Sequence, residues 1–300
     1  MKLEWTVPAG HGDVMLRKFI LGECKISVSL WKRMKWGGTV VLNGEEIHNA
    51  KTMLRAGDRL VCTWTEESEI IPADIPLSVV YEDDWLLIVD KPTGMMIHPT
   101  HKSPQETLVN AVAGYFVKCG VDAGIHPVYR LDRNTTGLVV VAKSAKIQYD
   151  LSKRHDLITR HYIAFVSGHL ETERGMIEAP IGRKDGSIVE WTVRDDGKPA
   201  VTEYEVLKRF DGFDVLRLLL RTGRTHQIRV HMSFLGHPLL GDTLYGGPAE
   251  KISRQALHAA DVSFVHPVTG EALHFEAPLP RDMEELLSEE RRTDEITIEG

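Results

Sequence analysis

The sequence predicts an α+β fold in which a small α/β unit precedes a larger, mostly antiparallel β-sheet. Beyond about residue 78, candidate strands gather in clusters and do not alternate regularly with helices, as they would in a doubly wound fold. The candidate strands are residues 86–89, 138–142, 162–166, 201–206 and 215–220, and the candidate helices are residues 106–117, 145–155, 225–235 and 281–290.

Residues 1–66 are expected to form the compact α/β unit. Ser27 can cap a helix that ends at Gly37-Gly38, because a serine oxygen accepts from free helix amides and glycine commonly ends helices. Asn43-Gly44 follows a β-branched run and is a strong signal for a hairpin turn. Residues 67–77 hold acids and two prolines without periodicity. They predict a linker to the larger domain, residues 78–300, which ends in an acidic tail.

The composition is that of an ordinary globular protein, with 42% apolar and 26% charged residues. The three cysteines are widely spaced and form no C-x-x-C pair, which excludes a disulfide framework and gives no zinc site. No apolar run is long enough to span a membrane, and the start lacks the apolar segment of a signal peptide. These features predict a cytoplasmic protein without a membrane partner.

The formal net charge of −7 weighs against a nucleic-acid partner, but the charges are unevenly distributed. Residues 15–60 hold nine Lys and Arg against four Asp and Glu. Lys32, Arg33 and Lys35 lie on the helix expected after Ser27, where they could bind phosphates. The alternative is that these cations only solvate a helix face, and composition alone does not choose between the two.

Asp132 is the first candidate for chemistry. It lies between Arg130 and Arg133 in a turn rich in threonine, which Gly137 ends. Either arginine would favour the charged form of the carboxyl, giving a carboxylate ready to act as nucleophile or base. The alternative is a turn aspartate that only bonds to backbone amides.

Residues 221–236 form the second candidate segment. Thr225 can cap a helix with a buried stripe of Ile228, Met232 and Leu235. Arg224, Gln227 and Arg229 gather near the start of this helix, where an anion such as a phosphate or a carboxylate is favoured. Unpaired arginines there would oppose the helix dipole, so an anion is the preferred interpretation.

The histidines do not predict a metal site. His226 and His231 are five residues apart, and His231 and His237 are six apart, with no acid between them. Neither spacing gives the two-ligand helix face of a zinc protease. No metal is expected.

Three motifs, in this order, resemble those of the RluA/RluD-type pseudouridine synthases. They are Asp90-Lys-Pro-x-Gly94, Arg130-Leu-Asp-x-x-Thr-x-Gly137 and Gly223-Arg-Thr-His-Gln-Ile-Arg229. The first alone is only a turn, but the combination is highly specific, and the resemblance extends over about residues 78–280. It implies the pseudouridine synthase fold. The N-terminal unit is similar to a small RNA-binding domain shared with a ribosomal small-subunit protein.

The resemblance also implies roles for individual residues. Asp132 matches the catalytic aspartate, Arg229 the arginine that pairs with it, and Tyr162 a tyrosine that contacts the flipped uracil. Arg130 matches the arginine that helps to expel the target nucleotide from its stack. One departure is Tyr129, where the family usually has histidine. The remaining residues expected to bind substrate or RNA are Lys91, Arg224, His226 and Gln227, together with Lys32, Arg33 and Lys35.

The implied reaction detaches uracil from ribose and reattaches it through carbon five. Breaking the glycosidic bond develops positive charge on the sugar, which a carboxylate stabilises or traps. The base must first leave its stack. An isomerisation of this kind needs no cofactor and no metal. The expected partner is RNA, not DNA, with ribosomal RNA favoured over transfer RNA by the N-terminal unit, and a monomer is expected because no coiled coil is apparent.

Two other functions remain open from the sequence. A non-catalytic RNA-binding or ribosome-assembly factor could keep this scaffold, although the intact set of Asp132, Tyr162 and Arg229 argues against it. A hydrolase would need a second carboxylate beside Asp132, for which Asp90 is the motif candidate. An activity assay separates the three.

Overall fold

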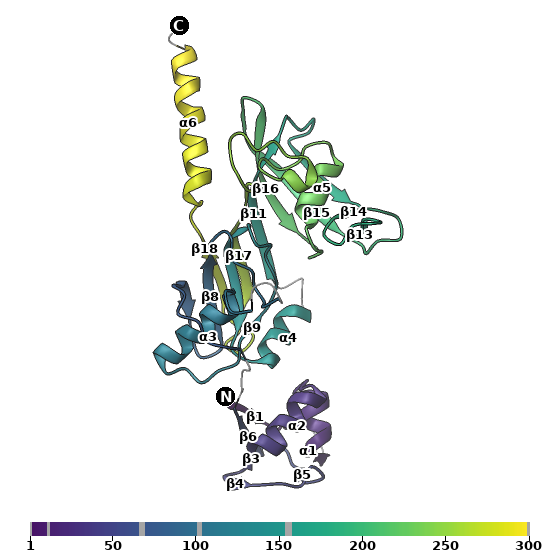
Figure 1. The fold of residues 1–300 in the computed structure, drawn as a ribbon. Coiled ribbons are helices and arrows are strands. Elements are labelled where there is room, and N and C mark those ends of the chain that lie inside the picture. Colours follow the sequence, from purple (N-terminus) through teal and green to yellow (C-terminus); the bar gives the residue numbers. More distant parts are fainter. Residues whose placement is uncertain (1, 11–12, 66–69, 101–103, 154–157, 299–300) are drawn as a thin grey trace.

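The protein is described from a computed structural model that covers residues 2–10, 13–65, 70–100, 104–153 and 158–298. Figure 1 shows a small N-terminal body at one end of the ribbon and a long C-terminal helix at the other. The first part of the predicted linker, residues 67–69, lies outside the described residues. No helix in the described ranges is long and apolar enough to cross a membrane.

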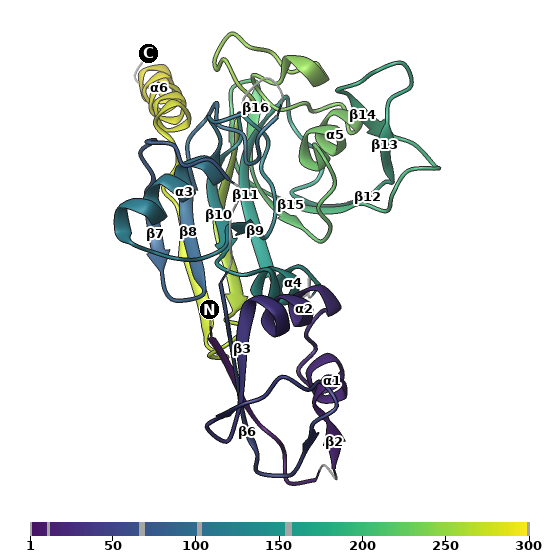
Figure 2. The same ribbon diagram turned by 60° about the horizontal axis from the view of Figure 1, so that its bottom comes forward.

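The N-terminal body is built on a four-stranded sheet that shares no strand with the rest of the protein (Figure 2). Its strand order is β1-β6-β3-β4, with the bounds Lys2–Thr6, Arg59–Trp64, Gly38–Leu42 and Glu45–Glu46. A short pair, β2 with β5, joins Val14–Met15 to Met53–Leu54. The helical segments are α1, a π-helical turn η1 and α2, with the bounds Leu16–Lys18, Phe19–Glu23 and Val28–Gly37.

Local signals in this body act as the sequence predicts. The Ser27 side chain accepts a hydrogen bond from the Leu30 amide at 3.2 Å, so Ser27 caps α2. The backbone changes from helix to strand at Gly38. Asn43 and Gly44 both have positive φ, 52° and 93°, which is the geometry of a tight hairpin turn.

The larger part is organised around a ten-stranded sheet. The main strand order is β12-β15-β16-β11-β17-β10-β8-β7, and β18 and β9 pair with β17 and β10. Among the described strand pairs of this sheet, β10 with β17 is parallel and the others are antiparallel. The prediction of a mostly antiparallel α+β sheet is confirmed. In chain order the bounds are β7 Ser78–Glu82, β8 Leu86–Lys91, β9 His126–Pro127, β10 Thr136–Ala142, β11 Ile158–Ser167, β12 Arg174–Glu178, β15 Val201–Phe210, β16 Phe213–Leu220, β17 Leu257–Val265 and β18 Ala272–Glu276.

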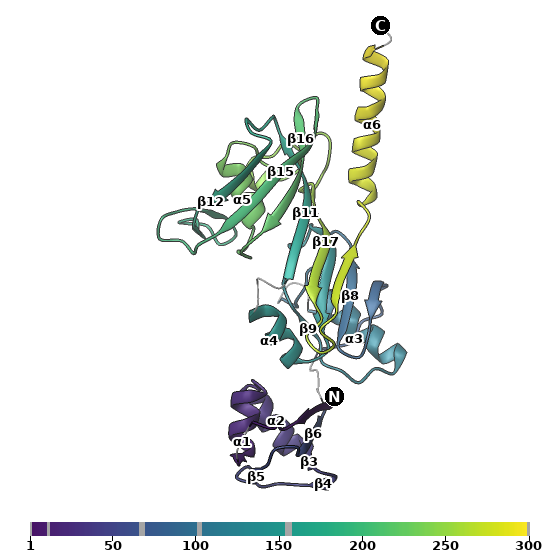
Figure 3. The same cartoon turned by 180° about the vertical axis from the view of Figure 1, so that it is seen from behind.

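Helices and one hairpin flank this sheet. Figure 3 shows α6 leaving the end of β18 and extending away from the strands. A two-stranded hairpin, β13 with β14, stands beside β12 and β15 (Figure 2). The bounds are α3 Leu108–Cys119, α4 Ala145–Lys153, α5 Gln227–Phe234, the 3-10 turn η3 Thr243–Tyr245, α6 Arg281–Ile298, β13 Ile181–Arg183 and β14 Trp191–Val193.

Strand β8 is buried on both faces, which explains its continuous aliphatic sequence. Leu87 and Val89 belong to a core that includes residues of α3, whereas Leu86 and Ile88 belong to a second core with residues of α4. The alternation of a strand thus divides one apolar run between two cores. This arrangement makes β8 and its neighbour β10 a rigid support for the turn that precedes β10.

The described end of the predicted linker is fastened to α3. Residues 70–76 form neither helix nor strand. The Ala73 amide donates to the Asn110 carbonyl at 3.0 Å, and the Asn110 side chain donates to the Ile71 carbonyl at 2.8 Å. Asp74 forms an ion pair with Lys118. Gly114 leaves room for this segment, because a Cβ there would lie 2.0 Å from the Ala73 oxygen.

Gly114→Ala tests this packing. Helix propensity alone favours alanine by about 1 kcal/mol. The added methyl would collide with the Ala73 backbone, and overpacking costs roughly 1–3 kcal/mol. We therefore expect a lower free energy of unfolding in urea. Val117→Ala, on the exposed face of the same helix, is the matched control and should be close to neutral. Stabilisation by Gly114→Ala would mean that residues 70–76 are not held against α3.

Candidate active site

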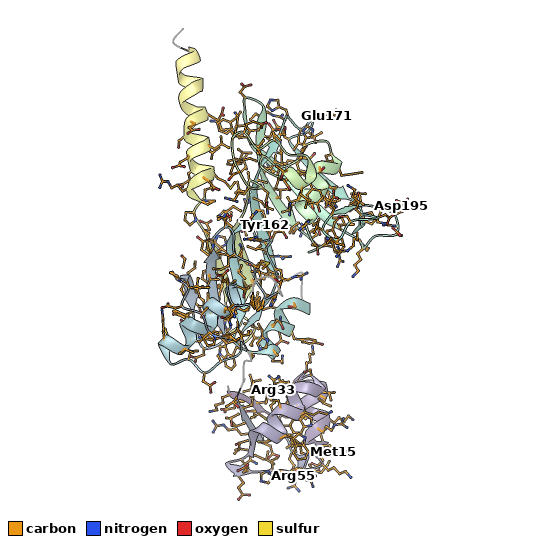
Figure 4. The ribbon with its side chains drawn as sticks, viewed as in Figure 1. Met15, Arg33, Arg55, Tyr162, Glu171 and Asp195 are labelled. Carbon is orange, nitrogen blue, oxygen red and sulfur yellow. The ribbon has the colours of Figure 1, made fainter. Side chains whose placement is uncertain are left out.

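A small pocket lies where the turn before β10 meets the start of α5. Its free volume is about 50 Å³. The turn contributes Asp132, β11 contributes Tyr162, and the start of α5 contributes Arg229. Figure 4 marks Tyr162 near the middle of the long sheet. The full lining consists of Arg130, Leu131, Asp132, Thr135, Tyr162, Leu220, Arg224, His226, Gln227, Ile228, Arg229 and Leu257.

Arg229 pairs with Asp132 across the pocket. Its Nη1 donates to Asp132 Oδ2 at 3.2 Å, and the Asp132 side chain is 24% exposed. The neighbours Arg130 and Arg133, which the sequence suggested as charge partners, do not fill this role in the described contacts: the Arg133 Nε donates to the Gly94 carbonyl at 3.0 Å. The ion pair of Asp132 is thus formed with Arg229 of α5, while Arg130 lines the same pocket without a described hydrogen bond or ion pair to the carboxylate.

Asp242 is the principal partner of Arg229 and was not predicted from the sequence. Its two carboxylate oxygens accept from Arg229 Nε and Nη2 at 2.6 and 2.7 Å, and Asp242 is only 2% exposed. Although burial works against the charge, Asp242 raises the pKa of Arg229. A buried arginine in a helix needs a buried acid as its partner. Asp242 follows the apolar Leu239-Leu240 and Gly241, and this position next to an apolar pair could have indicated a buried acid.

Tyr162 is buried, and burial raises the pKa of its phenol. Behind it, the guanidinium of Arg160 lies 4.7 Å from the ring centroid of Tyr129. The Tyr129 hydroxyl donates to the Leu138 carbonyl at 3.1 Å. Tyr129, which stands where histidine was expected, therefore packs behind the pocket and ties its wall to β10.

His226 starts α5 in place of the predicted cap Thr225. Its backbone is left-handed, with φ 57°, and its side chain caps no helix amide. Its Nδ1 lies 2.8 Å from the Tyr245 hydroxyl, and its Nε2 lies 3.9 Å from Asp132 Oδ1. Burial lowers the pKa of His226. The prediction for Thr225 is wrong, because Thr225 and His226 form a turn and α5 starts at Gln227, so that His226 occupies the capping position.

Comparison with known proteins decides the class of this site. Residues 85–234 match the family model described as RNA pseudouridylate synthase. The chain is also 43% identical to an uncharacterized RNA pseudouridine synthase, YjbO, of Bacillus subtilis, over 92% of this chain and 99% of the relative. The chain belongs to the RNA pseudouridylate synthase family. It is therefore an isomerase that acts on RNA, as predicted. The alternative of a hydrolase is ruled out.

Other relatives agree with this assignment. The synthase is 41% identical to ribosomal large subunit pseudouridine synthase D of Vibrio parahaemolyticus, over 82% of this chain and 81% of that protein. The protein of the same name in Escherichia coli is 38% identical, over 83% and 81%. Human RNA pseudouridylate synthase domain containing 1 has a TM-score of 0.57 and 26% identity, over 75% of this chain and 97% of that chain. The fold prediction is thus confirmed.

Lys91 does not face RNA in the synthase, which corrects its prediction as a binding residue. It is 0% exposed, and burial lowers its pKa to about 7. Its Nζ donates to three backbone oxygens, those of Pro92, Met95 and Arg133, at 2.8, 3.0 and 3.1 Å. Lys91 thus connects its own motif to the turn that carries Asp132 through hydrogen bonds to backbone oxygens.

Gln227 is also misassigned as a binding residue. Its Oε1 accepts from the Thr222 hydroxyl and the Arg224 amide at 2.8 and 2.9 Å. Its Nε2 donates to the Val201 oxygen and the Thr202 hydroxyl, both at 3.0 Å. All its polar capacity is used inside the protein, so it fastens the start of α5 to β15.

The other predicted binding residues remain accessible. Arg130 is exposed and lines the pocket, and Arg224 is half-buried there, with its Nε donating to the Pro199 oxygen at 2.9 Å. Lys32 and Arg33 are exposed on α2, and Lys35 lies 4.6 Å above the ring of Trp36. Figure 4 marks Arg33 on the N-terminal body. Contact of these residues with RNA stays a prediction.

Asp242→Asn tests the buried pair of the synthase. Removing one partner of a buried ion pair costs roughly 3–5 kcal/mol, because the other charge is stranded. We expect a loss at the lower end of that range in chemical denaturation, since Asp132 still faces Arg229. Glu203→Gln, which breaks an exposed pair with Arg221, should cost less than about 1 kcal/mol. Equal effects of the two changes would contradict the role of Asp242.

Proposed function

We propose that this synthase converts specific uridines of ribosomal RNA to pseudouridine, with Asp132 as the catalytic carboxylate. The observation that carries this proposal is the partly exposed Asp132 carboxylate in a pocket with Tyr162 and the buried cation of Arg229. Asp132 is the one acid among the residues that line this pocket. The proposed catalytic set is Asp132, Tyr162 and Arg229.

The chemistry follows from these groups. The bond between C1′ of the ribose and N1 of uracil breaks, and the base takes the bonding electrons. The carboxylate of Asp132 faces the positive charge that develops on the sugar. Attack on the sugar, attack on the base and removal of a ribose proton all need this carboxylate beside the nucleotide. The base turns, C5 bonds to C1′, the C5 proton leaves and N1 gains a proton, so the reaction is balanced without a cofactor.

The target base reaches the pocket only after it leaves its stack. The free volume is small, so a nucleotide enters singly and with local opening of the walls. Arg130, exposed at the pocket, is suited to occupy the space that the base leaves and to contact the flanking phosphates. Arg224 and His226 are the further polar groups that a flipped nucleotide would meet.

We further propose that residues 1–66 are an RNA-binding domain, joined through residues 67–77 to a catalytic domain of residues 78–300. The separate sheet and separate core of the first part support this division. Relatives named ribosomal large subunit pseudouridine synthase D support ribosomal RNA as the substrate. A cytoplasmic site of action belongs to the same proposal, and a monomer is the expected state.

Asp132→Asn is the decisive variant. It keeps the size and most hydrogen bonding of the side chain but removes the charge and the nucleophile. Release of tritium from C5 of uridine in labelled ribosomal RNA should fall to background, whereas RNA affinity and thermal stability are retained. Asp90→Asn is the control and should keep substantial activity, because Asp90 does not line the pocket. Turnover by Asp132→Asn would refute the mechanism.

The same assay addresses the alternative of a non-catalytic binding factor. Wild-type protein that binds RNA but releases no tritium from any RNA tried, large-subunit ribosomal RNA included, would favour that alternative. Loss of signal only on transfer RNA would leave the ribosomal assignment intact.

The cations of α2 are expected to supply RNA affinity. Each phosphate contact that is lost should lower the slope of log affinity against log salt by about 1. The double variant Lys32→Gln/Lys35→Gln should therefore reduce the slope by about 2 and leave turnover at saturating RNA unchanged. Lys2→Gln/Lys51→Gln, exposed elsewhere on the same unit, is the matched control. Equal slopes for both variants would show that the cations of α2 do not contact RNA phosphates.

A further inference from the structure

His226 adopts a backbone conformation that is uncommon for residues other than glycine. Its φ of 57° and ψ of 21° lie in the left-handed region, which glycine adopts freely and which histidine adopts more often than most other residues. Helix capping does not explain a histidine here, because its side chain bonds to no helix amide. Strain of this kind persists where the surroundings enforce it, and it gathers at functional sites. The imidazole itself is therefore the feature to explain.

Tyr245 fixes the imidazole from behind. The Tyr245 hydroxyl oxygen accepts from the Trp191 amide at 3.0 Å and lies 2.8 Å from His226 Nδ1. The two rings meet edge-on, with centroids 5.7 Å apart. The Trp191 amide occupies one lone pair of this oxygen, and the phenolic hydrogen can be directed to Nδ1. In that arrangement Nδ1 accepts, and the ring hydrogen of neutral His226 resides on Nε2.

The position of Nε2 supports the same tautomer. It lines the pocket and lies 3.9 Å from Asp132 Oδ1, where a bare nitrogen lone pair would face a carboxylate. The distance exceeds that of a hydrogen bond, so the Nε2 hydrogen is available to a ligand. The other oxygen, Oδ2, is held by Arg229. Burial lowers the pKa of His226, and the nearby charges of Arg229 and Arg183 lower it further. Asp132 and Asp242 raise this pKa, but the net direction is downward and favours the neutral ring.

We propose that His226 is a second catalytic residue, whose Nε2 hydrogen bonds to the uracil carbonyl oxygen that gains negative charge when the glycosidic bond breaks. The inference rests on the proposed function of the pocket. As the C1′–N1 bond breaks, its electron pair spreads over N1 and the carbonyl oxygens of the base. A fixed donor aimed at such an oxygen stabilises the transition state more than the ground state. His226 keeps its proton throughout, and the proton lost from C5 is balanced by the one gained at N1.

A neutral donor suits this pocket better than a charged one. An imidazolium would pair with the nearby Asp132 carboxylate and so weaken the interaction of this carboxylate with the positive charge that develops on the sugar. A neutral N–H serves the base without this effect. Tyr245 acts as a positioning residue, because its hydroxyl selects the tautomer that presents the hydrogen on Nε2.

The test measures tritium release from C5 in labelled large-subunit ribosomal RNA. His226→Gly should lower kcat about a hundredfold, the usual effect of removing one such donor. KM should change little, because the bond strengthens only as charge develops. His226→Gln, which keeps an N–H near the position of Nε2, should recover part of the loss. Tyr245→Phe should lower kcat about tenfold and retain the ring, whose centroid lies 4.9 Å from the Arg229 guanidinium. His274→Gln, exposed on β18, is the activity control.

Stability measurements separate catalysis from folding. His226→Gly relieves the left-handed strain, so its melting temperature should equal or exceed that of the wild type. Lys25→Gly, at φ 51° in the N-terminal unit, is the matched control for this relief. Full activity of His226→Gly with an active wild type would overturn the inference and leave the role of Asp132 standing. A raised KM with unchanged kcat would overturn it too. An inactive wild type would instead refute the proposed function.

Discussion

A buried guanidinium between two carboxylates connects the parts of this active site. Arg229 forms two short hydrogen bonds with Asp242 and reaches Asp132 with its remaining donor group. Without Asp242, a cation at this depth would incur a large desolvation cost. With it, α5, the loop before η3 and the turn before β10 are held in one arrangement. The Asp132 carboxylate, which we propose to be catalytic, is thus oriented by an arginine that is itself held by another acid.

The turn that carries Asp132 is also held by two further buried basic side chains. Lys91 donates to the Arg133 carbonyl and Arg254 donates to the next carbonyl, that of Asn134, both at 3.1 Å. Arg254 is in turn fixed by Asp282 at the start of α6. Successive backbone oxygens next to Asp132 are therefore tied to β8 and to the C-terminal helix. A carboxylate on a short turn gains in this way the rigidity of the sheet beneath it.

This construction suits an isomerisation that keeps its intermediate bound. The lining of the pocket combines the apolar side chains of Leu131, Leu220, Ile228 and Leu257 and the buried Tyr162 with polar groups that include Asp132. Charge in such a surrounding interacts strongly with the few fixed donors present. The family assignment explains the reaction. In our proposal the Asp132 carboxylate, held by Arg229, stabilises the sugar, and His226 stabilises the base.

The sequence by itself determined the features that depend on neighbouring residues. The Ser27 cap, the Asn43-Gly44 turn, the strand-rich order of the larger part and the three motifs around Asp90, Asp132 and Arg229 are all local patterns. Only the tertiary structure decided which of their side chains face RNA and which hold the protein together. Lys91 and Gln227 look like binding residues in a motif, yet burial and saturated hydrogen bonds make them supports. The pairing of Asp132 with Arg229, 97 residues apart, was expected only from the family resemblance, and the acid that fixes Arg229 lies outside every recognised motif. Such pairings arise from how sheet and helix stack, and local pattern carries no information about that stacking.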